Sequence, residues 1–352
     1  MKVTGYTLLV TLGLTRGAIN YKSFSNAISS VFGNGAQHVE KATDEGEKEK
    51  NFLADKDTPQ LLSKLTQSSK GSTPEEIAPS RFNPASNHSE YVASHPHSEA
   101  EAYRMVDFCG LAYCLEDSIK SLSCKACKHI RGGVEVLDIF TDSTYKGRSV
   151  LMLDNKHKQI VLIYRGSIFL SNWIEDFKVT MDTVPYAKDA KVIIGFKQMH
   201  QALFGNIIGP LKKTLDEYPS WPLIITGHSL GGSLSTMMAS ELLHRKTIPH
   251  SRLNVITFGE QRVGNVAFVR WYNSQPVRIT RVVNENDVIP HYVPTSLGYV
   301  HHATELYIHN NKTRICSNDK FEDPTCSLSR YPYLSIISHN KAWDLLLGLL
   351  AC

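Results

Sequence analysis

Four largely apolar runs in the body of the chain predict buried β-strands. They cover residues 159–164, 223–226, 253–258 and 278–283, and each ends at a glycine or a polar residue that begins a loop. The segments between them are long enough for helices. Because runs that are apolar on both faces are typical of strands covered on both sides, the pattern favours a mostly parallel sheet with helices on both faces. Ligands of such sheets bind where the carboxyl ends of the strands meet, so the chemistry is expected there.

The first residues have a different pattern, which is typical of a secretory signal. Residues 3–15 follow Lys2 and are largely apolar without any charge. This run is too short to span a bilayer and has the charge-then-apolar order of a signal peptide. We place the signal at residues 1–18, where the small pair Gly17-Ala18 is a candidate cleavage site. A buried N-terminal strand is the alternative.

The next segment, residues 19–97, is dominated by Ser, Lys, Glu, Asn and Pro. Such a segment buries too little apolar surface to fold as an independent core. Two short apolar groups within residues 24–32 and 52–65 have helix-like spacing and suit docking on a partner surface. We therefore predict a pro-segment, largely disordered or docked, ahead of one catalytic domain at residues 98–352.

Charge and cysteine content sharpen this division. The 352 residues include 38 basic and 34 acidic ones, for a net charge of +4. A charge so balanced argues against a nucleic-acid partner. All seven cysteines lie beyond position 100. The part that carries the predicted strands is therefore also the part that disulfides can crosslink.

Residues 227–231 have the sequence Gly-His-Ser-Leu-Gly and fit the G-x-S-x-G nucleophile elbow. They follow a predicted strand and precede a predicted helix, which is the context that this motif requires. The glycines suit a strained backbone and a close approach of helix to strand. We therefore predict that Ser229 is a nucleophile; a tight glycine turn with an exposed serine is the alternative.

An activated serine needs a base to accept its proton and an acid to orient that base. In the fold that carries this elbow, the chain order is serine, acid, histidine. Asp287 follows the strand at residues 278–283 and is the expected acid, with Glu285 as its nearest rival. Asp319 and Asp323 lie in a polar stretch between two cysteines and are expected to be solvated loop residues.

The expected base is His339, which follows an apolar run and lies in a polar turn. His291 shares the loop of Asp287 and is too close in sequence to reach back to the serine. His301 and His302 open a strand-like run, where a structural histidine is usual. His302 is the fallback for the base.

The chain resembles the fungal class 3 lipases, a triacylglycerol lipase family of the α/β-hydrolase superfamily, over roughly residues 104–352. The similar motifs lie at residues 163–167, 171–176, 226–232, 262–265, 284–290 and 298–301. The resemblance implies the α/β-hydrolase fold with a short helical lid, and it puts the triad on Ser229, Asp287 and His339, in agreement with the order argument.

The resemblance also implies an oxyanion hole. Its donors would be the backbone N–H of Leu230 and the backbone N–H and hydroxyl of Ser167. A tetrahedral intermediate carries a negative oxygen, and losing one such donor typically costs about 100- to 1,000-fold in rate. Ser167 as a plain turn residue is the alternative.

The segment after Ser167 resembles the lid helix of these lipases. Its apolar residues are Ile168, Phe169, Leu170 and Trp173. A lid that covers the site in water and turns this face to lipid explains so many apolar residues in one short helix. An ordinary buried helix is the alternative.

The cysteines suit the same family. The resemblance implies disulfides between Cys114 and Cys352, between Cys124 and Cys127, and between Cys316 and Cys326, which leaves Cys109 unpaired. A zinc site on Cys124, Cys127 and His129 is the rival interpretation, but no second cysteine pair has matching spacing. We expect no metal.

These observations together predict a secreted triacylglycerol lipase that acts at a lipid–water interface. We expect no cofactor, no nucleic-acid partner, a monomer, and a pro-segment that binds its own catalytic domain. Asn311 begins an Asn-Lys-Thr sequon, which suits glycosylation of a secreted chain. The alternatives are a feruloyl or short-chain carboxylesterase on the same fold, and a non-catalytic lipid-binding homologue.

Overall fold

The structure is a computed structural model that describes residues 96–168, 179–318, 321–330, 333 and 335–352. The chain divides into two units. One unit holds residues 1–70 and 167–178, of which Ser167 and Ile168 are described. The other unit carries all the elements below. The predicted signal, and the predicted pro-segment up to residue 95, lie outside the described residues.

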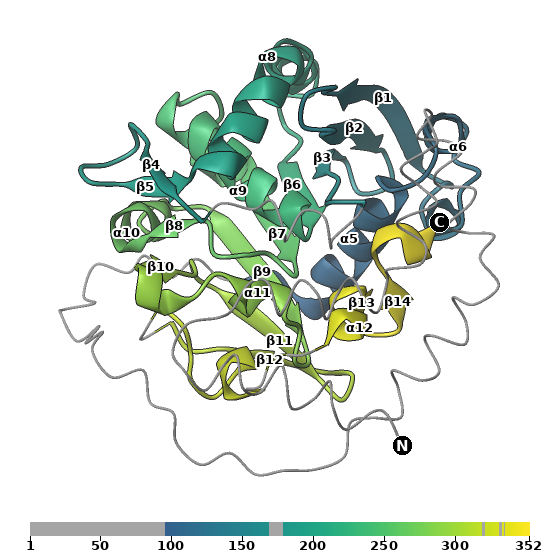
Figure 1. Ribbon diagram of the computed structural model, residues 1–352. Helices are drawn as coiled ribbons and strands as arrows, with labels where there is room; N and C mark the ends of the chain where they lie inside the picture. The colour runs from purple at the N-terminus through teal and green to yellow at the C-terminus, as the bar shows by residue number, and fades with distance from the viewer. Residues whose placement is uncertain (1–95, 169–178, 319–320, 331–332, 334) are drawn as a thin grey trace. The chain divides into compact units, whose positions relative to one another are not determined.

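An eight-stranded sheet forms the centre of the second unit, in the order β1-β2-β3-β6-β7-β9-β11-β12 (Figure 1). The strands are β1 (Val134–Thr141), β2 (Arg148–Asp154), β3 (Gln159–Tyr164), β6 (Leu223–His228), β7 (Leu253–Phe258), β9 (Arg278–Asn284), β11 (Glu305–His309) and β12 (Lys312–Ile315). Neighbours from β3 to β11 run parallel, whereas β1, β2 and β12 pair antiparallel. The four predicted strands are β3, β6, β7 and β9, so the expected mostly parallel sheet is confirmed.

Three long helices pack on this sheet: α5 (Glu99–Leu111), α8 (Ile194–Glu217) and α9 (Leu230–His244). Alternate strand residues point to opposite faces. Val161, Ile163 and Ile256 share one buried cluster with residues of α5. That cluster of described residues includes none from α9, although α9 packs against β3, β6 and β7. The two helices therefore cover opposite faces, and α8 packs over α9.

Shorter elements complete the unit. A second sheet has the order β10-β8-β5-β4, and β13 and β14 form a hairpin. Their bounds are β4 (Met181–Thr183), β5 (Lys191–Ile193), β8 (Gly264–Asn265), β10 (Tyr299–Val300), β13 (Lys341–Ala342) and β14 (Leu345–Leu346). The remaining helices are α6 (Glu116–Lys120), η1 (Ala126–His129), η2 (His250–Arg252), α10 (Val266–Asn273), α11 (Ile289–Tyr292), η3 (Thr295–Leu297), η4 (Ser327–Arg330), α12 (Ile336–His339) and η5 (Gly348–Ala351).

The N-terminal end of the described chain is attached to the sheet. Ser98 and Glu101 form a capping box that starts α5. Just before it, the imidazole of His97 is buried and lies 2.9 Å from the Thr280 hydroxyl and 3.2 Å from the Asn254 side-chain oxygen. These contacts link the start of α5 to β7 and β9.

Three disulfides crosslink this unit: Cys114–Cys352, Cys124–Cys127 and Cys316–Cys326. They are the pairs that the family resemblance implies, and Cys109 is a buried free thiol. Because Cys124 and Cys127 are bonded to each other, neither offers the thiolate that the rival zinc site needs.

One expectation about the Cys316–Cys326 loop is wrong. Asp323 is 8% exposed rather than solvated. Its carboxylate accepts hydrogen bonds from the backbone N–H groups of Ser317 and Thr325, at 2.9 and 2.8 Å. The loop folds back on this side chain, which satisfies backbone donors inside the turn. Asp319 lies outside the described residues.

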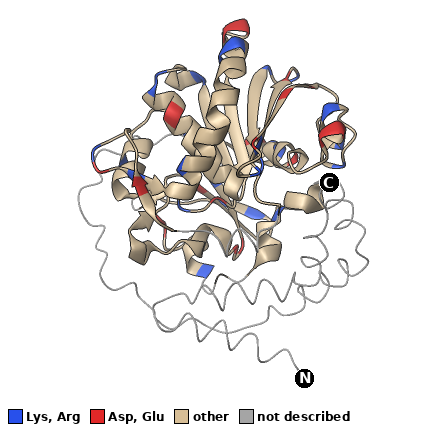
Figure 2. Ribbon diagram, turned by 45° about the horizontal axis from the view of Figure 1, so that its top comes forward, with Lys and Arg blue, Asp and Glu red and all other residues tan. Residues whose placement is uncertain are grey.

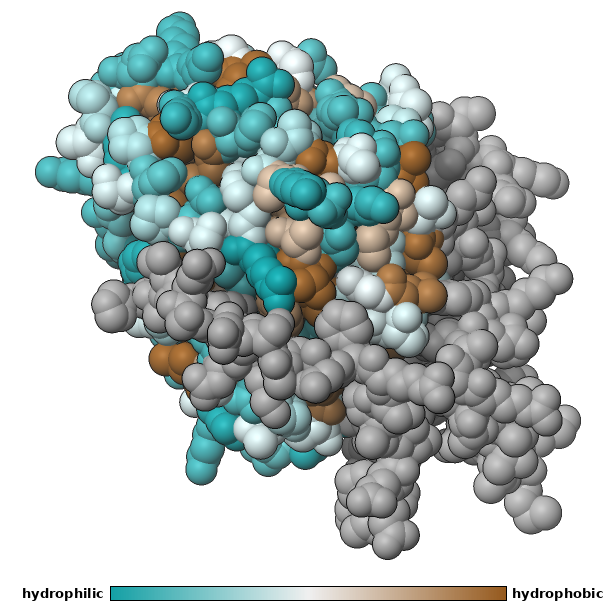
Figure 3. All heavy atoms as spheres, turned by 90° about the vertical axis from the view of Figure 1, so that its left-hand side faces the viewer, coloured by the Kyte–Doolittle hydropathy of each residue, from teal (hydrophilic) through white to brown (hydrophobic). Residues whose placement is uncertain are grey.

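Lys and Arg positions are interspersed with Asp and Glu positions along the described chain, and neither sign gathers in one region of the ribbon (Figure 2). On the face seen in Figure 3, hydrophobic residues form small groups separated by hydrophilic ones. In the ranges that the structure describes, no helix combines the length and apolarity that a membrane span requires.

Candidate active site

The nucleophile elbow lies between β6 and α9. Ser229 has φ 60° and ψ −129°, a strained conformation for a residue with a side chain. A Cβ at Gly227 would meet the backbone of Gly231, and a Cβ at Gly231 would meet the carbonyl of Tyr164. Both glycines are therefore needed for the helix to start so close to the strands. The elbow predicted from the sequence is confirmed as a strand, turn and helix that put Ser229 at the carboxyl end of the sheet, where the residue is 2% exposed.

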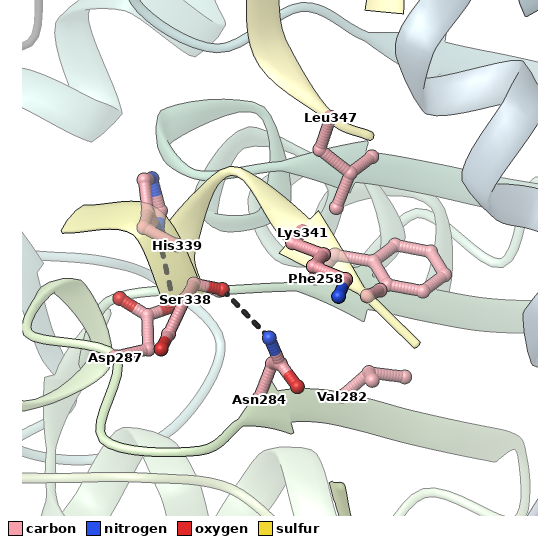
Figure 4. A pocket seen from close by; sticks show the side chains of 10 residues that line it. Phe258, Val282, Asn284, Asp287, Ser338, His339, Lys341 and Leu347 are labelled. Atoms are coloured by element: carbon pink, nitrogen blue, oxygen red, sulfur yellow. Dashed lines mark hydrogen bonds and ion pairs between the residues drawn. The ribbon is translucent and has the colours of Figure 1, made fainter. Parts of the chain in front are cut away.

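Asp287 and His339 come together from segments 52 positions apart. Asp287 Oδ2 lies 3.0 Å from His339 Nδ1, and both side chains are 1% exposed (Figure 4). The other carboxylate oxygen accepts the backbone N–H of Ile289 at 2.9 Å. Because a carboxylate only accepts hydrogen bonds, Nδ1 carries the proton and the Nε2 of a neutral ring keeps its lone pair. Nε2 is thus the atom of the His339 ring that can accept a proton.

The two atoms that would exchange a proton are both buried. Among the described residues, neither Ser229 Oγ nor His339 Nε2 has a hydrogen-bond partner. Buried polar atoms without partners are uncommon and need an explanation. Hydrogen bonds of a catalytic site are often loose without substrate and tighten in the reacting complex. Both atoms can therefore still take a hydrogen-bond partner that the described residues do not supply.

Residues of the neighbouring loops pack against the Asp287–His339 pair. A Cβ at Gly259, which has φ +55°, would lie 2.7 Å from His339 Nδ1 and 2.9 Å from Asp287 Oδ2. Glycine is required at this position because φ is positive and because there is no room for a side chain. The amide of Asn284 donates to the Ser338 carbonyl at 3.1 Å, next to His339. Asp287 and His339 line a small pocket together with Asn284, Ser338 and Lys341 (Figure 4).

The rival acid and base lie elsewhere. Glu285 accepts from the backbone N–H of Asn310 at 2.5 Å and lies 2.7 Å from His309 Nδ1. His302 Nε2 lies 3.1 Å from Glu260, a carboxylate that is fully buried. Neither residue forms a pair with Asp287 or His339, so the fallback assignments are not supported.

The predicted oxyanion donors and lid are described in part. Leu230 is the first residue of α9, where backbone N–H groups have no partner within the helix. Ser167 and Ile168 are half-buried and follow Gly166 in the chain. Phe169, Leu170 and Trp173 lie outside the described residues.

The predicted sequon lies in the turn between β11 and β12. Asn311 is exposed and has φ +58°. The hydroxyl of Thr313, the third residue of the sequon, accepts a hydrogen bond from the Trp343 indole at 3.0 Å. The asparagine itself is accessible for modification.

Comparison with known proteins gives one consistent result. A family model described as Lipase (class 3) matches residues 161–297. A lipase of Rhizomucor miehei is 30% identical over 220 residues, which are 61% of this chain and 60% of that protein. The matched part therefore spans less than two thirds of that relative.

Solved structures are similar over a larger share of their own length. The structure of Rhizomucor miehei triacylglyceride lipase has a TM-score of 0.68 and 26% identity, over 72% of this chain and 98% of that chain. A deletion mutant of the Rhizomucor miehei lipase propeptide complex has a TM-score of 0.68 and 25% identity, over 81% of this chain and 96% of that chain.

Proposed function

Since the chain belongs to the class 3 lipase family, we propose that it is a triacylglycerol lipase that hydrolyses carboxylic ester bonds of acylglycerols at a lipid–water interface. The observation that carries the proposal is the Asp287–His339 hydrogen bond beside a strained elbow serine. An Asp–His pair next to an elbow serine is the arrangement that activates a serine for acyl transfer, which supports this role for Ser229, Asp287 and His339. The Rhizomucor relative that is described as a triacylglyceride lipase supports the substrate class.

The proposed reaction has two halves. Ser229 Oγ attacks the ester carbonyl carbon while His339 Nε2 accepts the hydroxyl proton. The C–O bond to the glycerol oxygen then breaks, and the imidazolium returns its proton to that oxygen. Water attacks the acyl-enzyme with His339 again as base, which releases the fatty acid and restores the serine. Asp287 stabilises the imidazolium, and the N–H groups of Leu230 and Ser167 stabilise the negative oxygen of each tetrahedral intermediate.

The decisive experiment is titration of the fatty acid released from emulsified triacylglycerols, beside a dissolved short-chain ester. We expect faster turnover of the emulsion and no turnover by Ser229→Ala. Ser274→Ala, which changes an exposed serine directly after α10, is the matched control and keeps full activity. Equal turnover of both substrates would favour the esterase alternative. Activity that survives Ser229→Ala would contradict the mechanism, and an inactive wild type would favour a lipid-binding protein.

A lid over residues 168–173 is part of the proposal. The apolar Phe169 and Trp173 suit insertion into lipid. If this segment seeks the interface, Trp173→Ser lowers the rate on emulsion and leaves the rate on the dissolved ester unchanged. A loss that is equal on both substrates would assign the segment to the core instead.

We also propose that the chain is secreted and that the pro-segment, residues 19–97, binds the catalytic domain. The three disulfides support secretion, because disulfides persist in oxidising compartments. The propeptide complex of the Rhizomucor relative supports the pro-segment. A chain that starts at Pro96 keeps the hydrogen bonds of His97 and is the sharpest comparison with the full chain. Equal yield and activity of the two chains would refute a folding or inhibitory role.

Two smaller proposals complete the picture. Glycosylation of Asn311 predicts a mass decrease on endoglycosidase treatment of the secreted protein, which Asn311→Gln abolishes. A monomer predicts a single species near 39.4 kDa or below in sedimentation experiments once glycan is removed. A concentration-dependent larger species would contradict it.

A further inference from the structure

A buried tyrosine–histidine pair lies between the loops that carry the proposed catalytic groups. Tyr113 follows α5, and His228 is the last residue of β6, directly before Ser229. Both side chains are 1% exposed. Neither residue has a part in the proton transfers proposed above, so their burial beside the triad needs a separate explanation.

The donor and the acceptor can be assigned in both hydrogen bonds of the His228 ring. His228 Nε2 lies 2.8 Å from the backbone carbonyl oxygen of His339. A carbonyl only accepts, so Nε2 carries the proton and donates it. Burial, and then repulsion from His339 when that ring is protonated, hold the pKa of His228 well below its ordinary value, so the His228 ring is neutral at pH 7. Its Nδ1 therefore has a free lone pair, which accepts the Tyr113 hydroxyl at 2.9 Å.

The same hydroxyl reaches a third loop. The Tyr113 oxygen also packs against Gly166, in the loop after β3. A side chain at Gly166 would collide with that oxygen, so glycine is needed for the contact. Tyr113 therefore holds the end of β3 and, through His228, the backbone of His339. The His228 and His339 rings also pack together, with centroids 4.4 Å apart.

From these contacts we infer that Tyr113 and His228 are positioning residues, which hold the His339 backbone in register with the elbow and with the end of β3. Asp287 orients the His339 ring. The hydrogen-bonded residues Tyr113 and His228, called the relay below, fix the main chain that carries this ring. A misplacement of about 1 Å can cost about 100-fold in rate, so a restraint on that main chain has catalytic value. The inference rests on the proposed hydrolysis by Ser229 and His339.

Two substitutions at His228 separate positioning from space filling. Glutamine can donate to the His339 carbonyl from nearly the same place as Nε2, whereas leucine fills the site without a donor. We expect kcat on the dissolved ester to stay within about threefold of wild type in His228→Gln and to fall about tenfold in His228→Leu, with KM unchanged in both. Equal losses of kcat in the two variants would overturn the inference.

Tyr113→Phe tests the other end of the relay with little risk to folding. Loss of the hydroxyl leaves His228 Nδ1 unsatisfied, and we expect kcat to fall about three- to tenfold with KM unchanged. Tyr307→Phe is the matched control, because that buried hydroxyl has no hydrogen-bond partner among the described residues. A wild-type kcat in Tyr113→Phe overturns the inference. This test remains valid even if His228→Leu fails to fold.

The outcomes distinguish this inference from the function beneath it. If wild type hydrolyses esters, Ser229→Ala does not, and Tyr113→Phe matches wild type, the relay is wrong and the proposed function stands. If wild type hydrolyses no ester, the proposed function fails and the relay fails with it.

Discussion

Replacing Glu322 with glutamine removes one charge from a buried ion pair and leaves the other charge in place. Arg262 and Glu322 are 2% and 9% exposed and meet in two hydrogen bonds, with Nε–Oε1 at 2.7 Å and Nη2–Oε2 at 2.5 Å. Arg262 also donates to the Val293 carbonyl at 2.6 Å, and Glu322 accepts the His301 N–H at 3.1 Å. The pair therefore links the Cys316–Cys326 loop to three other segments, those of Arg262, Val293 and His301.

The magnitude follows from the electrostatics of the pair. Burial by itself would raise the pKa of Glu322, but the charge and hydrogen bonds of Arg262 outweigh it and lower the pKa from 4.5 to about 2. By linkage, this shift corresponds to about 3 kcal/mol of stability at neutral pH. Breaking one side of a buried pair typically costs about 3–5 kcal/mol, which agrees. We expect Glu322→Gln to lower the free energy of unfolding by about 3 kcal/mol.

The depressed pKa also determines how the stability difference between wild type and Glu322→Gln changes with pH. A carboxyl group with a depressed pKa in the folded state contributes stability above its unfolded pKa of 4.5 and loses it as pH falls toward 2. The gap between wild type and Glu322→Gln is therefore full at pH 7 and has roughly halved by pH 3. Urea unfolding at both pH values measures it.

Glu116→Gln is the control for this experiment. Glu116 and Lys120 form an ion pair of 2.7 Å on the surface, with side chains 44% and 58% exposed. Water screens exposed pairs, so we expect an unchanged unfolding midpoint. If Glu322→Gln and Glu116→Gln shift the midpoint equally, or if the gap does not shrink at low pH, the reasoning about burial is refuted.

Three further predictions concern other parts of the molecule. Asp287→Asn lowers kcat about 10,000-fold without a change in melting temperature, because the asparagine favours the wrong tautomer of the catalytic histidine; a loss under tenfold in ester assays would contradict the triad. Burial, and then the charge of Arg278, lower the pKa of His97 to about 4, so the free energy of unfolding falls as pH drops from 6.5 toward 4. We expect His97→Asn to flatten this part of the plot of urea midpoint against pH. An unchanged plot would argue against a buried neutral imidazole. The disulfide between Cys114 and Cys352 closes 238 positions, so the double serine variant loses about 3–5 kcal/mol in thermal or urea unfolding, and a wild-type midpoint would show that the bond constrains little.

The sequence alone was sufficient for the elements whose signals are local. The runs that became β3, β6, β7 and β9 are largely apolar, and such runs separated by helix-length segments favour buried parallel strands. The elbow at Ser229 is equally local, because strand, turn and helix are consecutive and the glycines mark the close approach. The order of serine, acid and histidine, together with the place of Asp287 after a strand and of His339 in a polar turn, then favoured these two residues.

Other features depend on which distant segments meet. Asp323 and Glu322 lie in a polar stretch that predicts a solvated loop, yet both are largely buried. The partner of Glu322 is 60 positions away in the chain, and no local pattern announces it. Likewise, nothing around Tyr113 in the sequence indicates that its hydroxyl reaches His228, 115 positions further on.

The physical reason for this difference is the range of the interactions involved. Hydrophobic periodicity and turn chemistry act between neighbours in sequence, so they are legible in the chain before it folds. The burial of a charge or a hydroxyl is tolerated only where a partner from another segment satisfies it. The sequence therefore determined the sheet, the elbow and the candidate triad, and only the tertiary structure decided which polar groups are buried together and hold those residues in place.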